Sequence, residues 1–125
     1  MDEIYQRLYR ERILDYYKCP RFKGVIDNAL VDITVHNPAC GDSIRLTVGR
    51  EAHAYTYRFE GKGCVISQAS ASMVLEAVHN LNTRDVSKIL AIDPLVLFGT
   101  TLGENRKQCV LLIMQALKKA FAQLS

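Results

Sequence analysis

The chain has 125 residues, of which 49% are hydrophobic and 23% charged, and its formal net charge is +3. This length predicts one domain, residues 1–125, with a single hydrophobic core. The weak and scattered positive charge argues against nucleic-acid binding. No apolar run is long enough to span a membrane, and the N-terminus lacks the pattern of a secretion signal. We therefore expect a cytoplasmic protein without nucleic-acid or membrane partners, either a monomer or a weak homo-oligomer.

The first half of the chain predicts one helix followed by three strands. Residues 2–17 carry apolar side chains three and four positions apart, the spacing of an amphipathic helix, and Pro20 ends it. Apolar and polar residues then alternate in three segments, 31–36, 44–48 and 55–60. Alternating segments joined by short turns predict an antiparallel meander with one apolar face.

The second half predicts the helices that cover this face. Helical periodicity is present in residues 67–81 and again in the last twenty residues of the chain. Asn82 or Thr83 is a candidate N-cap for a short helix ending at Leu90, and Asn105 is the candidate N-cap of the last helix. The predicted fold class is therefore α+β, a three-stranded antiparallel sheet covered by helices.

Three of the four cysteines stand at related places in this pattern. Cys40 lies in the turn between the first two strands, Cys64 lies between the last strand and a helix, and Cys109 lies in the first turn of the last helix. Asp42 follows Cys40 by two residues, whereas Cys19 in its basic loop has no obvious partner. Three thiolates and one carboxylate are a suitable ligand set for a tetrahedral metal site.

The sequence around Cys64 places its thiol at the predicted start of a helix. Gly61 and Gly63 permit a tight turn, and a helix N-terminus stabilises negative charge. Lys62 and Arg106 could stabilise thiolate charge, or could simply be solvated surface residues. For Cys64 alone, a small buried cysteine is the alternative interpretation. The histidines, at positions 36, 53 and 79, are expected on the surface rather than among the ligands.

Three cysteine-centred motifs resemble one family. Residues 37–42 read NPACGD, residues 61–73 read GKGCVISQASASM, and residues 106–112 read RKQCVLL. Together with the N-terminal helix they resemble the U-type iron–sulfur cluster assembly scaffolds, which comprise IscU, SufU and the N-terminal domain of NifU. The resemblance covers nearly the whole chain. It implies four ligands for a metal or cluster: Cys40, Asp42, Cys64 and Cys109.

The resemblance also implies an activity. Family members accept sulfur from a PLP-dependent cysteine desulfurase, build a transient [2Fe–2S] cluster from iron and sulfide, and transfer it to apo iron–sulfur client proteins. Zinc often occupies the same ligands. Such a protein is a scaffold or carrier rather than an enzyme, although its thiols could also act in sulfur transfer. Of the two candidate sulfur acceptors, Cys109 and Cys40, the second fits better because its Gly-containing turn can move toward a partner.

The residues that distinguish IscU from SufU give mixed signals in this chain. Gln108 replaces the histidine that IscU members carry before the last cysteine, and residues 102–106 lack their LPPVK segment. Arg106 resembles SufU, but the chain has no room for the insertion typical of SufU. Three hypotheses therefore remain: a cluster scaffold, a zinc-dependent sulfurtransferase, and a zinc-stabilised structural domain. A hydrolase is disfavoured because four protein ligands leave no open position on the metal.

Overall fold

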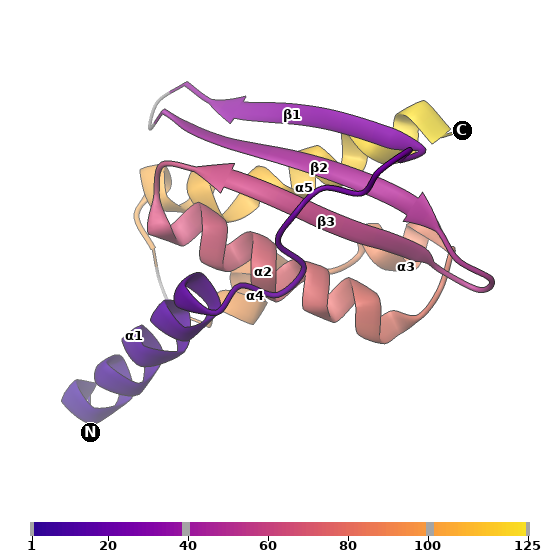
Figure 1. Ribbon diagram of the computed structural model, residues 1–125. Helices are drawn as coiled ribbons and strands as arrows, with labels where there is room; N and C mark the ends of the chain where they lie inside the picture. The colour runs from indigo at the N-terminus through magenta and orange to yellow at the C-terminus, as the bar shows by residue number, and fades with distance from the viewer. Residues whose placement is uncertain (1, 39–40, 100–101, 125) are drawn as a thin grey trace.

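The computed structural model describes residues 2–38, 41–99 and 102–124. The elements are, in chain order, α1 (Asp2–Lys18), β1 (Val31–Asn37), β2 (Asp42–Arg50), β3 (Tyr55–Lys62), α2 (Val65–Leu81), α3 (Val86–Leu90), α4 (Pro94–Phe98) and α5 (Glu104–Leu124). The strands form an antiparallel sheet in the order β1-β2-β3 (Figure 1). The predicted α+β class, the meander and the two terminal helices are confirmed.

One face of the sheet is covered by helices. α5 packs on β1 and β2, and α2 packs on β3, while α1 packs on α2 (Figure 1). The alternation in the strands explains this layering, because every second residue of β1 from Val31 onward is buried and the residues between them are exposed. The centre of the core contains fully buried side chains from both layers: Ile44, Leu46, Phe59, Leu75, Leu112 and Leu117.

A smaller apolar cluster holds α1 against the rest of the molecule. It consists of buried Ala69, Met73, Phe98 and Val110, with Tyr9, Ile13 and Tyr16 of α1 packed against it. Small Ala and Ser side chains along α2 let the neighbouring helices approach closely. Two hydrogen bonds reinforce the contact. Tyr16 donates to Glu76 Oε1 at 2.7 Å, and the main-chain N of Arg21 donates to Ser72 Oγ at 2.7 Å.

The chain between α1 and β1 crosses the open face of the sheet (Figure 1). The segment first pairs with β3, where the main-chain N of Phe59 donates to Phe22 O at 2.8 Å, and then Ile26 N donates to the side chain of Thr47 at 3.1 Å. The rest of this face is polar, and Arg45 pairs with Asp32 at 2.6 Å. Among the helices in the described ranges, none combines the length and apolar character needed to cross a membrane.

The caps of the helices differ from the sequence-based predictions. α3 is capped by Asp85, whose carboxylate accepts a hydrogen bond from Ser87 N, whereas Asn82 ends α2 in a left-handed conformation with φ 48°. α5 begins at Glu104 rather than after Asn105, so Cys109 lies in its second turn. Several polar residues stand close together before α3, and the carboxylate of Asp85 is the one that reaches a main-chain N–H group of the helix.

Candidate metal centre

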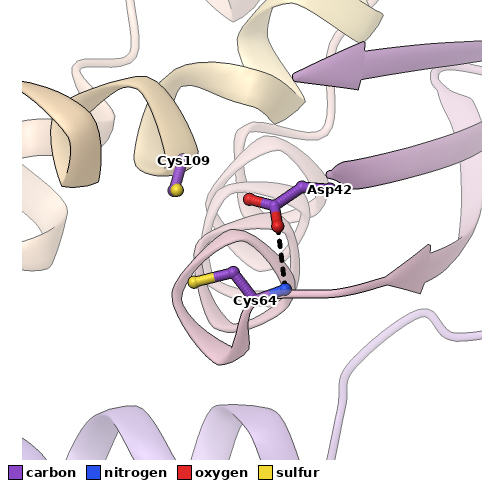
Figure 2. Close-up of side chains that lie close together, drawn as sticks. All are labelled: Asp42, Cys64 and Cys109. Atoms are coloured by element: carbon purple, nitrogen blue, oxygen red, sulfur yellow. Dashed lines mark hydrogen bonds between the residues drawn. The ribbon is translucent and has the colours of Figure 1, made fainter. Parts of the chain in front are cut away.

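Asp42 begins β2 and points toward the helices instead of toward solvent. It pairs with Asn37 across the β1–β2 hairpin, and only 1% of its surface is exposed. Its Oδ1 accepts a hydrogen bond from the main-chain N of Cys64 at 2.9 Å (Figure 2). Its Oδ2 is buried and has no hydrogen-bond partner within the described residues. A buried carboxylate oxygen is costly without a partner, so a bound cation would satisfy it.

Cys64 lies in the turn that leads from β3 to α2. Gly63 has φ +94° and a Cβ at this position would lie 2.7 Å from Asp42 Oδ1, so both the conformation and the space require glycine. Cys64 is the N-cap of α2, and its Sγ accepts a hydrogen bond from Ile66 N at 3.3 Å. The thiol is only partly buried. The sequence predicts this position, between the last strand and the start of a helix.

Cys109 approaches the same place from α5. It is 3% exposed and lies in the second turn of the helix. The side-chain amide of Asn37 donates to its sulfur, with 3.8 Å between Nδ2 and Sγ. On the same helix, the carbonyl of Val110 accepts a hydrogen bond from Ser70 Oγ at 2.7 Å, which ties α5 to α2 beside the thiol. The position of Cys109 is therefore set by helix packing.

The three side chains converge (Figure 2). One ligand atom from each of Asp42, Cys64 and Cys109 lies within 4.8 Å of the others. In a tetrahedral zinc site with Zn–S bonds of about 2.3 Å, two sulfurs are about 3.8 Å apart. An inward movement of about 1 Å would therefore suffice for the three atoms to share one ion. Two sulfurs and a carboxylate oxygen are donors that suit zinc or iron, so this cluster is consistent with a metal site.

The fourth predicted ligand, Cys40, lies outside the described residues. Cys19 is exposed at the end of α1, and the metal-capable cluster found within the described ranges includes neither Cys19 nor a histidine. The histidines at positions 36, 53 and 79 are exposed, as expected. The structure thus places three of the four predicted ligands together at one end of the sheet.

The two basic residues considered as thiolate partners are both exposed. Lys62 lines a hollow on the open face of the sheet, together with His36 and Arg45. Arg106 borders an apolar groove between α1, α4 and the start of α5. Their predicted role as partners of the thiolates stays a prediction.

Asn37 is a site residue that no sequence motif singles out. Val31, Ile33 and Val35 face inward, and continuing this alternation by one step places Asn37 inward as well. The dipeptide Asn37-Pro38 instead suggested a turn. The structure extends β1 through Asn37 and leaves it 8% exposed. A polar residue at an inward-facing strand position was the signal that could have identified it.

Comparison with known proteins shows the family. Residues 8–125 match the family described as the NifU-like N terminal domain. The chain belongs to this family. The match includes Asp42, Cys64 and Cys109 and extends to the last residue of the chain.

Individual relatives point to two branches of this NifU-like family. The zinc-dependent sulfurtransferase SufU of Bacillus subtilis is 43% identical over 86 residues, which cover 68% of this chain but only 56% of that protein. The iron–sulfur cluster assembly scaffold protein IscU of Thermotoga maritima is 30% identical over 98% of both chains. A solved structure of a putative iron–sulfur cluster assembly scaffold protein for the SUF system, from Fervidobacterium islandicum, has a TM-score of 0.68 at 26% identity over 88% of this chain and 93% of that one.

Proposed function

We propose that this protein is an iron–sulfur cluster assembly scaffold that receives sulfur from a cysteine desulfurase and holds a transient [2Fe–2S] cluster as cargo for apo-proteins. Its ligands are Cys40, Asp42, Cys64 and Cys109. The observation that carries the proposal is the buried, unpartnered Oδ2 of Asp42 beside two cysteine sulfurs. A mixed set with one carboxylate holds iron less firmly than four thiolates would, which suits a site that must release its cargo.

Sulfur would enter by exchange between thiols. The acceptor thiolate attacks the outer sulfur of the desulfurase persulfide, and the S–S bond of that persulfide breaks. The desulfurase cysteine leaves as a thiolate, and the acceptor becomes the persulfide. We assign the acceptor role to Cys40, because Cys109 is 3% exposed and Cys64 caps a helix through its sulfur. Conversion of this sulfur to sulfide then requires two electrons from an external reductant.

An apolar groove beside the ligands is the proposed docking surface for the desulfurase. Its volume is about 250 Å³, and its lining includes Leu14 and Ile66 with Arg10 and Arg106. Ile66 lies two residues after Cys64, so the groove borders on the site. Because both charged lining residues are arginines, we propose that an apolar segment with acidic neighbours on the desulfurase occupies it.

This docking surface predicts the effect of a single charge. Leu14→Glu should weaken co-elution with the desulfurase, because it places a carboxylate on the apolar lining of the groove. Val96→Glu is a matched control, since Val96 is 72% exposed and does not line the groove. Equal binding by both variants would assign docking to another surface.

The central experiment is anaerobic reconstitution with ferrous iron, cysteine, a desulfurase and a thiol reductant, followed by optical spectra. A [2Fe–2S] absorption spectrum that disappears on addition of an apo-ferredoxin supports the scaffold. The similarity to SufU favours a second candidate, a zinc-dependent sulfurtransferase. That candidate predicts faster desulfurase turnover with zinc bound and no cluster spectrum at any iron concentration.

A zinc-stabilised structural domain makes a third, different prediction. If a structural ion maintained the fold, a chelator would unfold the protein, because metal binding and folding would be coupled. Circular dichroism with and without a chelator measures this directly. A collapse of the helical signal, together with no effect on the desulfurase, would contradict both sulfur-handling functions.

A further inference from the structure

Three hydrogen bonds from N–H groups reach the described ligand residues, although Asp42 Oδ2 accepts none of them. Asp42 Oδ1 accepts from Cys64 N at 2.9 Å, and Cys64 Sγ accepts from Ile66 N at 3.3 Å. Both donors belong to the main chain. Cys109 Sγ accepts from the side chain of Asn37 at 3.8 Å, a distance within reach of the large sulfur atom. Asn37 is therefore the donor that a substitution can remove.

The surroundings of Asn37 direct this amide toward the sulfur. Its main-chain O accepts a hydrogen bond from Gly41 N at 2.9 Å, and across the hairpin it pairs with Asp42. Its inward side chain is 8% exposed. The strand thus brings a buried amide to a thiol 72 residues away in sequence. Both partners are buried, and a hydrogen bond is stronger where water does not compete for it, so the contact with Cys109 has a physical reason to persist.

We propose that Asn37 is a positioning residue that makes Cys109 a retained ligand and keeps it from serving as a sulfur nucleophile. This inference rests on the proposed metal site. An N–H group that donates to a metal-bound thiolate withdraws electron density from the sulfur, which lowers both its donation to the metal and its nucleophilicity. Burial and this hydrogen bond both lower the reactivity of the Cys109 sulfur toward another protein. The sulfur acceptor is then a different cysteine, in agreement with the assignment of Cys40.

The test removes the donor while keeping the shape of the side chain. Asn37→Leu removes all polar atoms, and Asn37→Asp keeps the shape but presents only acceptors when ionised. Both variants are made in a Cys19→Ser background, because Cys19 is an exposed thiol that would react with an alkylating reagent. Ser70→Ala is the matched structural control: Ser70 is buried, and its hydroxyl donates to the carbonyl of Val110, the residue after Cys109 in α5.

Two readouts report on the sulfur itself. With Co²⁺ as the probe metal, the sulfur-to-cobalt charge-transfer band should move to lower energy in both Asn37 variants and stay unchanged in Ser70→Ala. In the zinc-loaded proteins, iodoacetamide should modify Cys109, located by peptide mass, about fivefold faster in the Asn37 variants, the factor that corresponds to one typical hydrogen bond. Melting temperatures show whether each variant is folded. If Asn37→Leu does not fold, Asn37→Asp alone provides the test.

The outcomes separate this inference from the proposed function. If the parent protein binds Co²⁺ with a thiolate band but neither Asn37 variant changes the band or the alkylation rate, the role of Asn37 is refuted and the metal site stands. The same shift in Ser70→Ala would also refute it, because helix packing would then explain the effect. If the parent protein gives no thiolate band at all, the metal site itself is refuted, and the inference with it.

Discussion

Gly63→Ala tests how the turn before α2 builds the site. Gly63 has φ +94°, and an added Cβ would lie 2.7 Å from Asp42 Oδ1 and 3.1 Å from Asp42 Cα. The left-handed backbone costs an alanine about 1–2 kcal/mol. Moving the carboxylate away also removes its hydrogen bond with Cys64 N, worth about 1.5–3 kcal/mol for a charged acceptor. The expected loss of stability is therefore about 2.5–5 kcal/mol.

Gly99→Ala separates these two contributions. Gly99 has φ +80°, yet an added Cβ would lie no closer than 3.9 Å to its neighbours, none of which is a ligand, and this residue caps α4. We expect the stability of this control to fall only by the cost of the left-handed backbone conformation, about 1–2 kcal/mol. Urea denaturation monitored by circular dichroism gives both values, and titration with a zinc indicator gives the affinities.

The two variants should differ most in metal binding. Gly63→Ala displaces an oxygen ligand, so we expect zinc affinity to fall by at least about 10-fold, whereas Gly99→Ala should bind zinc as the parent does. If Gly63→Ala costs no more than Gly99→Ala and binds zinc equally well, the link between this turn and Asp42 is not what positions the ligands.

Three further predictions follow from individual side chains. Asp42→Ala removes the carboxylate ligand and keeps the thiolates, and we expect its reconstituted cluster to survive longer in air than the parent's; a shorter lifetime, measured by visible absorption, would show that the carboxylate retains the cluster. Cys19→Ser should leave the stimulation of desulfurase turnover intact and Cys40→Ser should abolish it, and full stimulation by Cys40→Ser would assign the acceptor role to another thiol. The hydrogen bond to Glu76 raises the pKa of Tyr16, so this pair stabilises the fold fully below about pH 10 and loses its contribution as the pH rises through the raised pKa. Tyr16→Phe should therefore cost at most about 1 kcal/mol at pH 7 and make stability fall less steeply above pH 10, and identical urea midpoints for the two proteins across this range would rule the contribution out.

Much of the fold can be predicted from the spacing of apolar residues alone. The alternation of Val31, Ile33 and Val35 predicts a strand with one buried face, and the burial in β1 follows it residue by residue. The change to helical spacing after Cys64 predicts α2. These patterns are strong because burial imposes a period on the sequence wherever one face of an element is covered. The ends of elements are harder to predict than their existence. The carboxylate of Asp85 caps α3, whereas the sequence pattern favours Asn82 or Thr83.

The candidate site was accessible only in part. The order of the cysteine motifs predicts that Asp42, Cys64 and Cys109 belong together, and the structure brings their ligand atoms within 4.8 Å. Sequence could not supply the hydrogen bonds that orient them. The contact between Asn37 and Cys109 spans 72 residues, and it depends on how α5 lies across β1. Such a contact is a consequence of packing, which no local pattern encodes.

The way the ligands are held bears on the choice between a carrier and a structural metal site. Asp42 is placed by strand pairing, Cys64 by its helix cap, and Cys109 by the packing of α5 on the sheet. The main cluster of buried apolar side chains, which includes Ile44 and Leu117, contains none of these three ligands. Because apolar burial of this extent supplies most of the stability of a small domain, the fold should survive loss of the metal. A site whose removal leaves the fold intact can give up its cargo repeatedly, which is what a scaffold or a sulfur carrier requires and what a structural zinc ion does not.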